Sequence, residues 1–135
     1  MGVLFLVLFC LTLSRESTGE EADKAIEAGG LVVVKYYLET CHFCTKIKEE
    51  YKSLENDLAS FGDKIQFLDI NCKEHKEFCE KGGVHSFPTI IPYYHKLMYE
   101  QLLPPREIFN WKLQILEIYN SPLNEKYIGK TKFKV

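Results

Sequence analysis

The chain has 135 residues, of which 46% are hydrophobic and 27% are charged. This length suits a single domain, and this composition excludes a disordered, collagen-like or coiled-coil protein. Lys and Arg number 17 against 19 Asp and Glu, which gives a net charge of -2. The chain therefore lacks the overall positive field that attracts nucleic acid, and we expect a globular domain that binds none.

The first 19 residues have the pattern of a signal peptide. The apolar run Val3–Leu13 is far shorter than the ~20 residues of a membrane-spanning helix. The small residues Ser17 and Gly19 lie two apart, which favours signal-peptidase cleavage near Gly19 and Glu20. The alternative is a buried N-terminal strand or helix. A cleaved leader predicts the endoplasmic reticulum lumen or secretion, with no stable membrane insertion.

The first half of the remaining chain, which we take as a domain over 20–120, alternates helices and strands. Glu20–Ala28 has helix formers, acidic residues at its start and two glycines after it, which predicts a short helix. Leu31–Leu38 is β-branched, aromatic and almost continuously apolar, as in a strand that is covered on both faces. Thr45–Phe61 repeats apolar residues every three or four positions, which predicts an amphipathic helix.

The second half continues this alternation. The patterns predict strands at Ile65–Ile70 and Thr89–Tyr94, a helix at Glu74–Lys81, a weak fourth strand at Leu97–Leu103 and a final helix from Pro104 to Tyr119. A strand, helix and strand in succession imply a parallel pair, whereas the strands after Pro88 are expected to be antiparallel. The prediction is a small α/β sandwich, with Trp111 in its core.

The last residues, 121–135, form a basic tail. They carry four lysines: Lys126, Lys130, Lys132 and Lys134. Such a run is typical of a solvated chain end, and contact with a membrane surface or a polyanion is the alternative.

Four cysteines remain if the leader, which contains Cys10, is removed. They are Cys41, Cys44, Cys72 and Cys79, and four cysteines allow three disulfide pairings that their spacing cannot distinguish. Four thiolates would also suit zinc. However, Cys72 and Cys79 are too far apart in sequence for a zinc knuckle, and a secretory route favours disulfides, so we expect no metal.

The sequence CHFC, residues 41–44, lies between a predicted buried strand and a predicted helix. The first sulfur would then meet the unpaired N–H groups at the helix start, which stabilise a thiolate, so Cys41 is the predicted nucleophile. Cys44 lies within one turn and is the predicted resolving thiol. A protonated His42 would lower the pKa of the Cys41 thiol further; alternatively, His42 points to solvent.

These residues resemble the thioredoxin superfamily, and most closely the redox-active domains of protein disulfide isomerases. The strand, CHFC and helix, the segment INC with Cys72, and GGVHSFPTI with Pro88 follow in the order of that family, from about Glu20 to Tyr119. The resemblance implies a thioredoxin-like three-layer sandwich in which helices flank a mixed central sheet. It also implies a thiol-disulfide oxidoreductase that acts on proteins or peptides.

Further site residues follow from the resemblance. It implies a cis peptide bond between Phe87 and Pro88 that faces the cysteine pair, and an extended substrate segment bound along Phe87, Pro88 and Thr89. It also implies a second, structural disulfide between Cys72 and Cys79.

Three positions depart from the pattern of the family. Lys35 stands where the family usually has a buried acid, Thr40 where it often has Trp, and Thr45 where it often has Lys. In the family the acid is thought to take the proton of the resolving thiol. Our hypothesis is that Lys35 lies near Cys44 and lowers the pKa of its thiol; the alternative is that Lys35 reaches solvent at a strand edge.

The sequence thus predicts a protein disulfide isomerase-like enzyme that works as a monomer and needs no metal, nucleotide or flavin. The residues between the cysteines do not distinguish oxidation, reduction and isomerisation. The alternative is a secreted binding or chaperone module that keeps the fold and uses CHFC as an inert disulfide.

Overall fold

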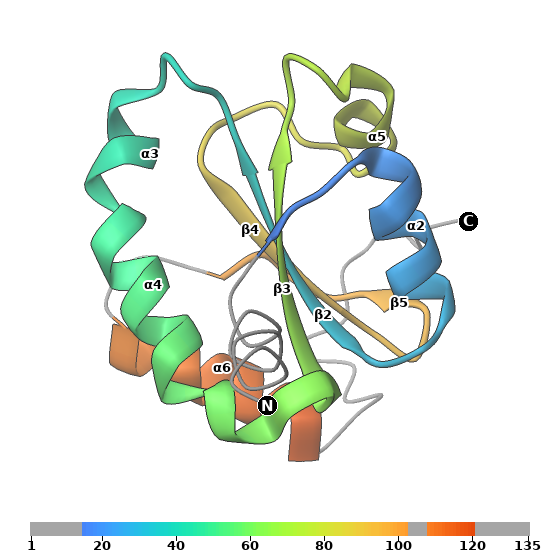
Figure 1. Cartoon of the computed structure of the whole chain (residues 1–135), viewed down its shortest axis with the longest axis vertical. Coiled ribbons are helices and arrows are strands. Elements are labelled where there is room, and N and C mark those ends of the chain that lie inside the picture. The colour runs from blue at the N-terminus through green and yellow to red at the C-terminus, as the bar shows by residue number, and fades with distance from the viewer. Residues whose placement is uncertain (1–14, 103–107, 121–135) are drawn as a thin grey trace, which may run out of the picture.

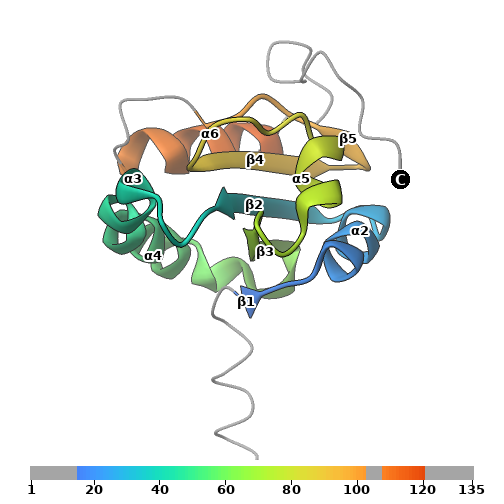
Figure 2. The same ribbon diagram turned by 90° about the horizontal axis from the view of Figure 1, so that it is seen from above.

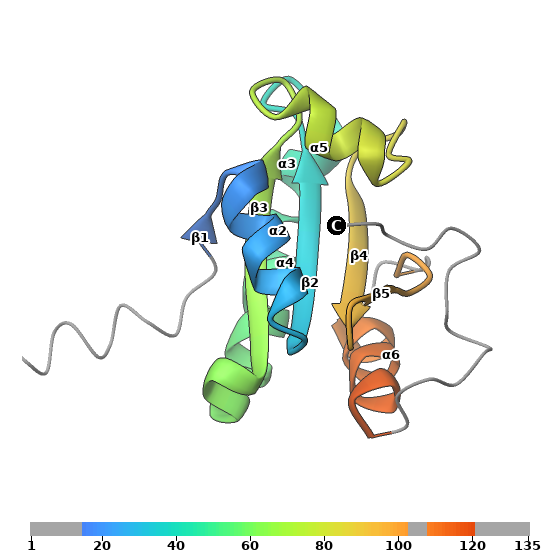
Figure 3. The same ribbon diagram turned by 90° about the vertical axis from the view of Figure 1, so that its right-hand side faces the viewer.

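Strand β2 (Leu31–Tyr37) lies at the centre of a five-stranded mixed sheet (Figure 1). The structure is a computed structural model, and it describes residues 15–102 and 108–120. β2 pairs in parallel with β3 (Ile65–Asn71) and antiparallel with β4 (Thr89–Tyr94). The short strands β1 (Arg15–Glu16) and β5 (Leu97–Met98) extend the sheet beyond β3 and β4. Figure 3 shows the strands in this order across the molecule.

Helices cover both faces of the sheet, which gives three layers (Figure 2). Helices α2 (Gly19–Glu27) and α5 (Lys76–Lys81) lie on one side. The other side carries α3 (His42–Lys46), α4 (Lys48–Asp57) and α6 (Ile108–Asn120), and a 3-10 helix, η1 (Ala59–Lys64), leads from α4 to β3. In the part of the chain that the structure describes, no helix is long and apolar enough to cross a membrane.

Two apolar clusters hold the layers together, one on each face of the sheet. Alternate residues of β2 point to opposite faces, so Val32 and Val34 join one cluster while Leu31 and Val33 join the other. All four side chains are fully buried. This burial on both faces explains why the sequence of β2 is a continuous apolar run. Trp111 of α6 is buried in the second cluster, so its predicted place in the core is confirmed.

The predicted fold class and the three main strands are confirmed. The single helix predicted at Thr45–Phe61 is wrong: helix begins at His42, because Cys41 caps it, and it divides at Ile47 into α3 and α4. The weak strand predicted at Leu97–Leu103 covers only two residues. The predicted start of the last helix, the apolar leader and the basic tail lie outside the described residues.

In the part of the chain that the structure describes, the first element, β1, begins at Arg15, upstream of the predicted domain boundary at residue 20. Arg15 and Glu16 pair with β3, and the Ser17 N–H donates to the Asp69 carbonyl at 2.9 Å. Thr18 caps α2, because its Oγ1 accepts the Glu21 N–H at 3.1 Å. Cleavage at Gly19 would remove all of these contacts.

We therefore expect a chain that starts at Arg15 to be more stable than one that starts at Glu20. The shorter chain loses an edge strand and an N-cap, and a cap alone contributes about 1 kcal/mol to the free energy of unfolding. Denaturant unfolding of the two purified chains measures the difference. Equal midpoints and slopes would mean that β1 and the cap contribute nothing to stability.

Two tyrosine hydroxyls meet in the core beneath α5. Tyr36 of β2 and Tyr93 of β4 are fully buried and hydrogen-bonded to each other. Burial raises the pKa of Tyr36 well above its usual value, and the neighbouring Tyr93 raises it further. The pKa of Tyr93 is also raised, mainly by burial. Both phenols are therefore neutral in the folded protein.

These shifts predict a loss of stability in alkali. The unfolded chain releases the phenolic protons near pH 10 while the folded chain retains them. The stabilisation is therefore complete below about pH 10 and falls as the pH rises beyond it. Denaturant midpoints from pH 7 to 11 should decline less steeply in a Tyr36→Phe/Tyr93→Phe double variant. A decline as steep as in the wild type would assign the alkaline loss to other groups.

Candidate redox site

Cys41 occupies the position directly before helix α3. It is the N-cap residue, and its Sγ accepts a hydrogen bond from the Cys44 N–H at 3.1 Å. Backbone N–H groups at a helix start stabilise negative charge on a nearby sulfur. Cys41 therefore lies at a helix start, as the sequence predicted, where backbone N–H groups can stabilise its thiolate.

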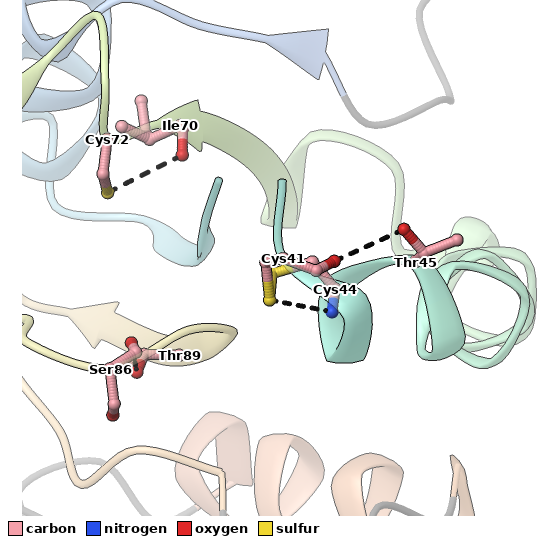
Figure 4. Close-up of a disulfide and its surroundings, with 7 residues drawn as sticks. All are labelled: Cys41, Cys44, Thr45, Ile70, Cys72, Ser86 and Thr89. Atoms are coloured by element: carbon pink, nitrogen blue, oxygen red, sulfur yellow. Dashed lines mark hydrogen bonds between the residues drawn. A yellow bond between two sulfur atoms is a disulfide. The ribbon is translucent and has the colours of Figure 1, made fainter. Parts of the chain in front are cut away.

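Cys41 and Cys44 form a disulfide, with their Cα atoms 5.2 Å apart (Figure 4). The two sulfurs differ in their surroundings, since Cys41 is half-buried whereas Cys44 is only 9% exposed. An incoming thiol or disulfide can therefore reach Cys41 more readily than Cys44. This asymmetry is what an attacking sulfur and a resolving sulfur require.

The loop before β4 lies at the same end of the sheet as Cys41. Because β2 and β4 are antiparallel and Tyr36 pairs with Thr89, the chain that leaves β2 and the chain that enters β4 meet at this edge. The Phe87–Pro88 peptide bond is cis, and both residues are half-buried. Figure 4 shows Thr89 and its hydrogen-bond partner across from the disulfide.

This loop contains a hydrogen bond and borders a cavity. The Thr89 hydroxyl donates to the Ser86 carbonyl at 2.7 Å. A cavity of about 120 Å³ is lined by Pro88 of this loop, by Ile47 at the end of α3 and by Trp111 of α6. The proline loop and the helix that carries the cysteines therefore border the same cavity.

The two residues between the cysteines face solvent. His42 is exposed, and its ring lies edge-on to Phe43 with 5.9 Å between the ring centroids. Phe43 is 53% exposed, which is more than any other large apolar side chain among the described residues. The site therefore presents an imidazole and an apolar ring beside its accessible sulfur.

Lys35 lies in the centre of the sheet and not at an edge, so the alternative in which it reaches solvent at a strand edge is wrong. It is 9% exposed. Its ammonium lies 3.5 Å from a carboxylate oxygen of Asp69, the residue opposite it on β3, and 4.6 Å from the centroid of the Tyr51 ring. Two elements therefore hold the buried cation in place.

Lys35 and Cys44 line one cavity of about 330 Å³. Burial raises the pKa of Tyr37, at its wall, well above the usual value, and a hydrogen bond to Glu16 raises it further. The full lining is Glu16, Lys35, Tyr37, Leu38, Glu39, Cys44, Thr45, Lys48 and Asp69. The sequence singled out Lys35 and Cys44 but missed Asp69, whose position becomes visible only through the register of β2 and β3.

The second pair, Cys72 and Cys79, forms a separate disulfide with 5.8 Å between the Cα atoms. It joins the end of β3 to α5, and its cysteines are 7% and 3% exposed. Burial keeps this disulfide away from thiols in solution. Within residues 15–102 and 108–120, no group of His, Cys, Asp and Glu is arranged to hold a metal ion.

Replacing Cys72 and Cys79 together by Ser should destabilise the domain. Their disulfide closes a short loop, and the chain-entropy model assigns such a loop about 2 kcal/mol. Denaturant unfolding under oxidising conditions measures the loss. As a control, the wild-type protein treated with mild reductant that opens only Cys41–Cys44 should keep most of its stability. An unchanged midpoint in the double variant would contradict a structural role.

Residues 14–101 match the family model described as thioredoxin. The chain belongs to the thioredoxin family. Among its relatives, a probable protein disulfide-isomerase A6 of Medicago sativa is 32% identical over 73 residues, covering 54% of this chain and 20% of that protein. Bloodstream-specific protein 2 of Trypanosoma brucei brucei is 26% identical over 98 residues, covering 67% and 19%. The chain thus spans about a fifth of the length of these relatives.

Solved structures agree with this fold. The J-Trx1 fragment of ERdj5 superposes on this thioredoxin domain with a TM-score of 0.73 at 17% identity, covering 82% of this chain and 51% of that one. At this identity the likeness concerns the fold alone. The family assignment and the Cys41–Cys44 geometry together define the candidate site.

Proposed function

We propose that this thioredoxin-family protein exchanges disulfides with protein or peptide thiols in the secretory pathway. The observation that carries the proposal is the position of Cys41. It is the more accessible sulfur of the pair, it caps α3, and its Sγ accepts a backbone N–H. Relatives with the name protein disulfide isomerase support the proposed activity.

In the proposed reaction, the Cys41 thiolate attacks one sulfur of a substrate disulfide. A mixed disulfide forms, and the other substrate sulfur leaves as a thiolate that takes a proton from solvent. Cys44 then attacks the Cys41 sulfur, so that the Cys41–Cys44 disulfide forms and the second substrate sulfur leaves. The substrate gains two electrons and the cysteine pair loses them, and the reverse sequence oxidises a substrate dithiol.

The other residues have supporting roles in this proposal. An extended segment of substrate lies along Phe87, Pro88 and Thr89, at the same edge of the sheet as the sulfurs. His42, when protonated, adds positive charge near Cys41. Lys35 stabilises the Cys44 thiolate from within the cavity that they share.

The proposed location follows from the apolar leader, which would direct the chain to the endoplasmic reticulum lumen or to secretion. The two disulfides fit an oxidising compartment. We propose that the protein acts there as a monomer. A pulse-labelled full-length chain that enters microsomes with loss of its leader would support this location, and a chain that stays outside would refute it.

The catalytic role of Cys41 is tested by single replacements. Cys41→Ser should abolish reduction of insulin and refolding of scrambled ribonuclease, because the attacking sulfur is lost. Cys44→Ser should instead accumulate a mixed disulfide on Cys41, visible by mass spectrometry. The Cys72→Ser/Cys79→Ser variant, assayed where it is folded, serves as the control and should keep its activity. Activity that survives Cys41→Ser would favour a binding module with an inert CHFC disulfide.

A further inference from the structure

The cavity behind Cys44 contains a buried ion pair in which the basic residue stands on β2 and the acidic one on β3. Lys35 lies directly opposite Asp69 in the register of the two strands, and its ammonium is 3.5 Å from the Asp69 carboxylate. Both residues line the same cavity as Cys44. The cavity, about 330 Å³, has room for water between these groups.

We propose that Asp69 is the proton acceptor for the Cys44 thiol and that Lys35 is its positioning residue. This inference rests on the proposed function and concerns its second step. The carboxylate behind the resolving cysteine lies on β3, and the cation beside it lies on β2.

Asp69 is the carboxylate of this cavity that fits the role. Its side chain is 19% exposed, whereas Glu16 and Glu39 are exposed residues at the cavity wall. Glu39 accepts a hydrogen bond from the Asn71 side chain at 3.3 Å. The hydrogen bond between Glu16 and Tyr37, which raises the pKa of Tyr37, engages Glu16 at the other side.

Lys35 fixes the position of this carboxylate. Its ammonium lies 3.5 Å from Asp69 and over the face of the Tyr51 ring at 4.6 Å, so the cation is held between β3 and α4. Tyr51 is fully buried, and its pKa is raised first by burial and then by the charge of Asp69. The phenol therefore stays neutral and does not compete with the carboxylate for the cation.

The proton transfer keeps the charge of the cavity constant. When Cys44 is a thiol, the negative charge of the buried ion pair lies on the Asp69 carboxylate, opposite the Lys35 ammonium. The proton moves from the Cys44 sulfur, through water, to Asp69, and the negative charge passes to the sulfur. Cys44 then attacks the Cys41 sulfur, and the bond between Cys41 and the substrate breaks. The departing thiolate takes up the proton that Asp69 releases through water, which restores the Asp69 carboxylate. Lys35 lines the same cavity as both groups that carry the negative charge, Asp69 before the transfer and Cys44 after it.

Several other groups line the cavity with Asp69 or act on the tyrosines beside it, and they contribute to its electrostatic surroundings. They are Glu16 on β1, Lys35 and Tyr37 on β2, Glu39 after β2, Cys44 and Thr45 on α3, and Lys48, Tyr51 and Glu55 on α4.

The test uses the full chain with the Cys41–Cys44 pair reduced, and the aromatic disulfide 5,5′-dithiobis(2-nitrobenzoate) as the probe. The first release of coloured thiolate reports attack by Cys41, and the second reports attack by Cys44 on the mixed disulfide. Asp69→Asn should slow the second release about 100-fold near pH 7, the lower end of the range for general acid–base catalysis. The first release should stay unchanged. The second rate should also rise in proportion to hydroxide between pH 6 and 8, more steeply than in the wild type.

Two variants separate this role from a structural one. Lys35→Gln/Asp69→Asn removes both charges, so no buried ion lacks a counterion, and we expect the second release to stay slow. If this neutral pair restored the wild-type rate, Asp69 would act only by compensating Lys35, and the proposal would be overturned. Asp23→Asn changes an aspartate that is ion-paired to Lys81 at 3.2 Å, away from this cavity, and should leave both releases unchanged.

The remaining outcomes are equally decisive. If folded Asp69→Asn showed an unchanged rate of second release and an unchanged pH profile, the proposal would be overturned. It would also be overturned if Glu16→Gln or Glu39→Gln slowed the second release while Asp69→Asn left its rate at the wild-type value. A first release that keeps its wild-type rate in Cys41→Ser would instead refute the proposed function itself. The two failures are therefore distinguishable.

Discussion

The double pairing of β2 is the constraint on which the site depends. This strand is hydrogen-bonded to β3 on one side and β4 on the other, and its residues from Leu31 to Tyr36 are buried. Its C-terminal end delivers Cys41 to the edge of the sheet, and its antiparallel partner brings Pro88 to the same edge. The parallel partner places Asp69 opposite Lys35. One strand thus fixes the sulfurs, the proline loop and the ion pair.

The two disulfides differ in burial, and this difference suits one of them to a redox role and the other to a structural role. Cys41 is half-buried at a helix start, where the backbone stabilises a thiolate, whereas Cys72 and Cys79 are almost completely buried against the opposite face of the sheet. The accessible pair can meet a substrate and the buried pair cannot. A charged cavity lies behind Cys44, so we place proton transfer at the resolving sulfur.

Much of this arrangement was predictable from the sequence. The apolar pattern predicted the three main strands, and CHFC between a strand and a helix predicted that Cys41 lies near a helix start. That Cys41 is the N-cap appeared only in the structure, because the predicted helix began at Thr45. Asp69 was not predictable, because its role depends on strand register, which local patterns do not carry. Nor was β1, because two residues are too short for a periodic signal. The division of the helix at Ile47 was missed because its apolar spacing continues through the break.

The most direct measurement is the reduction of the two disulfides in a series of glutathione redox buffers, with each cysteine quantified by alkylation and mass spectrometry. The account predicts that Cys41–Cys44 opens within the range of the buffer while Cys72–Cys79 stays oxidised. Joint resistance of both pairs, or earlier opening of Cys72–Cys79, would contradict an exchange site at Cys41.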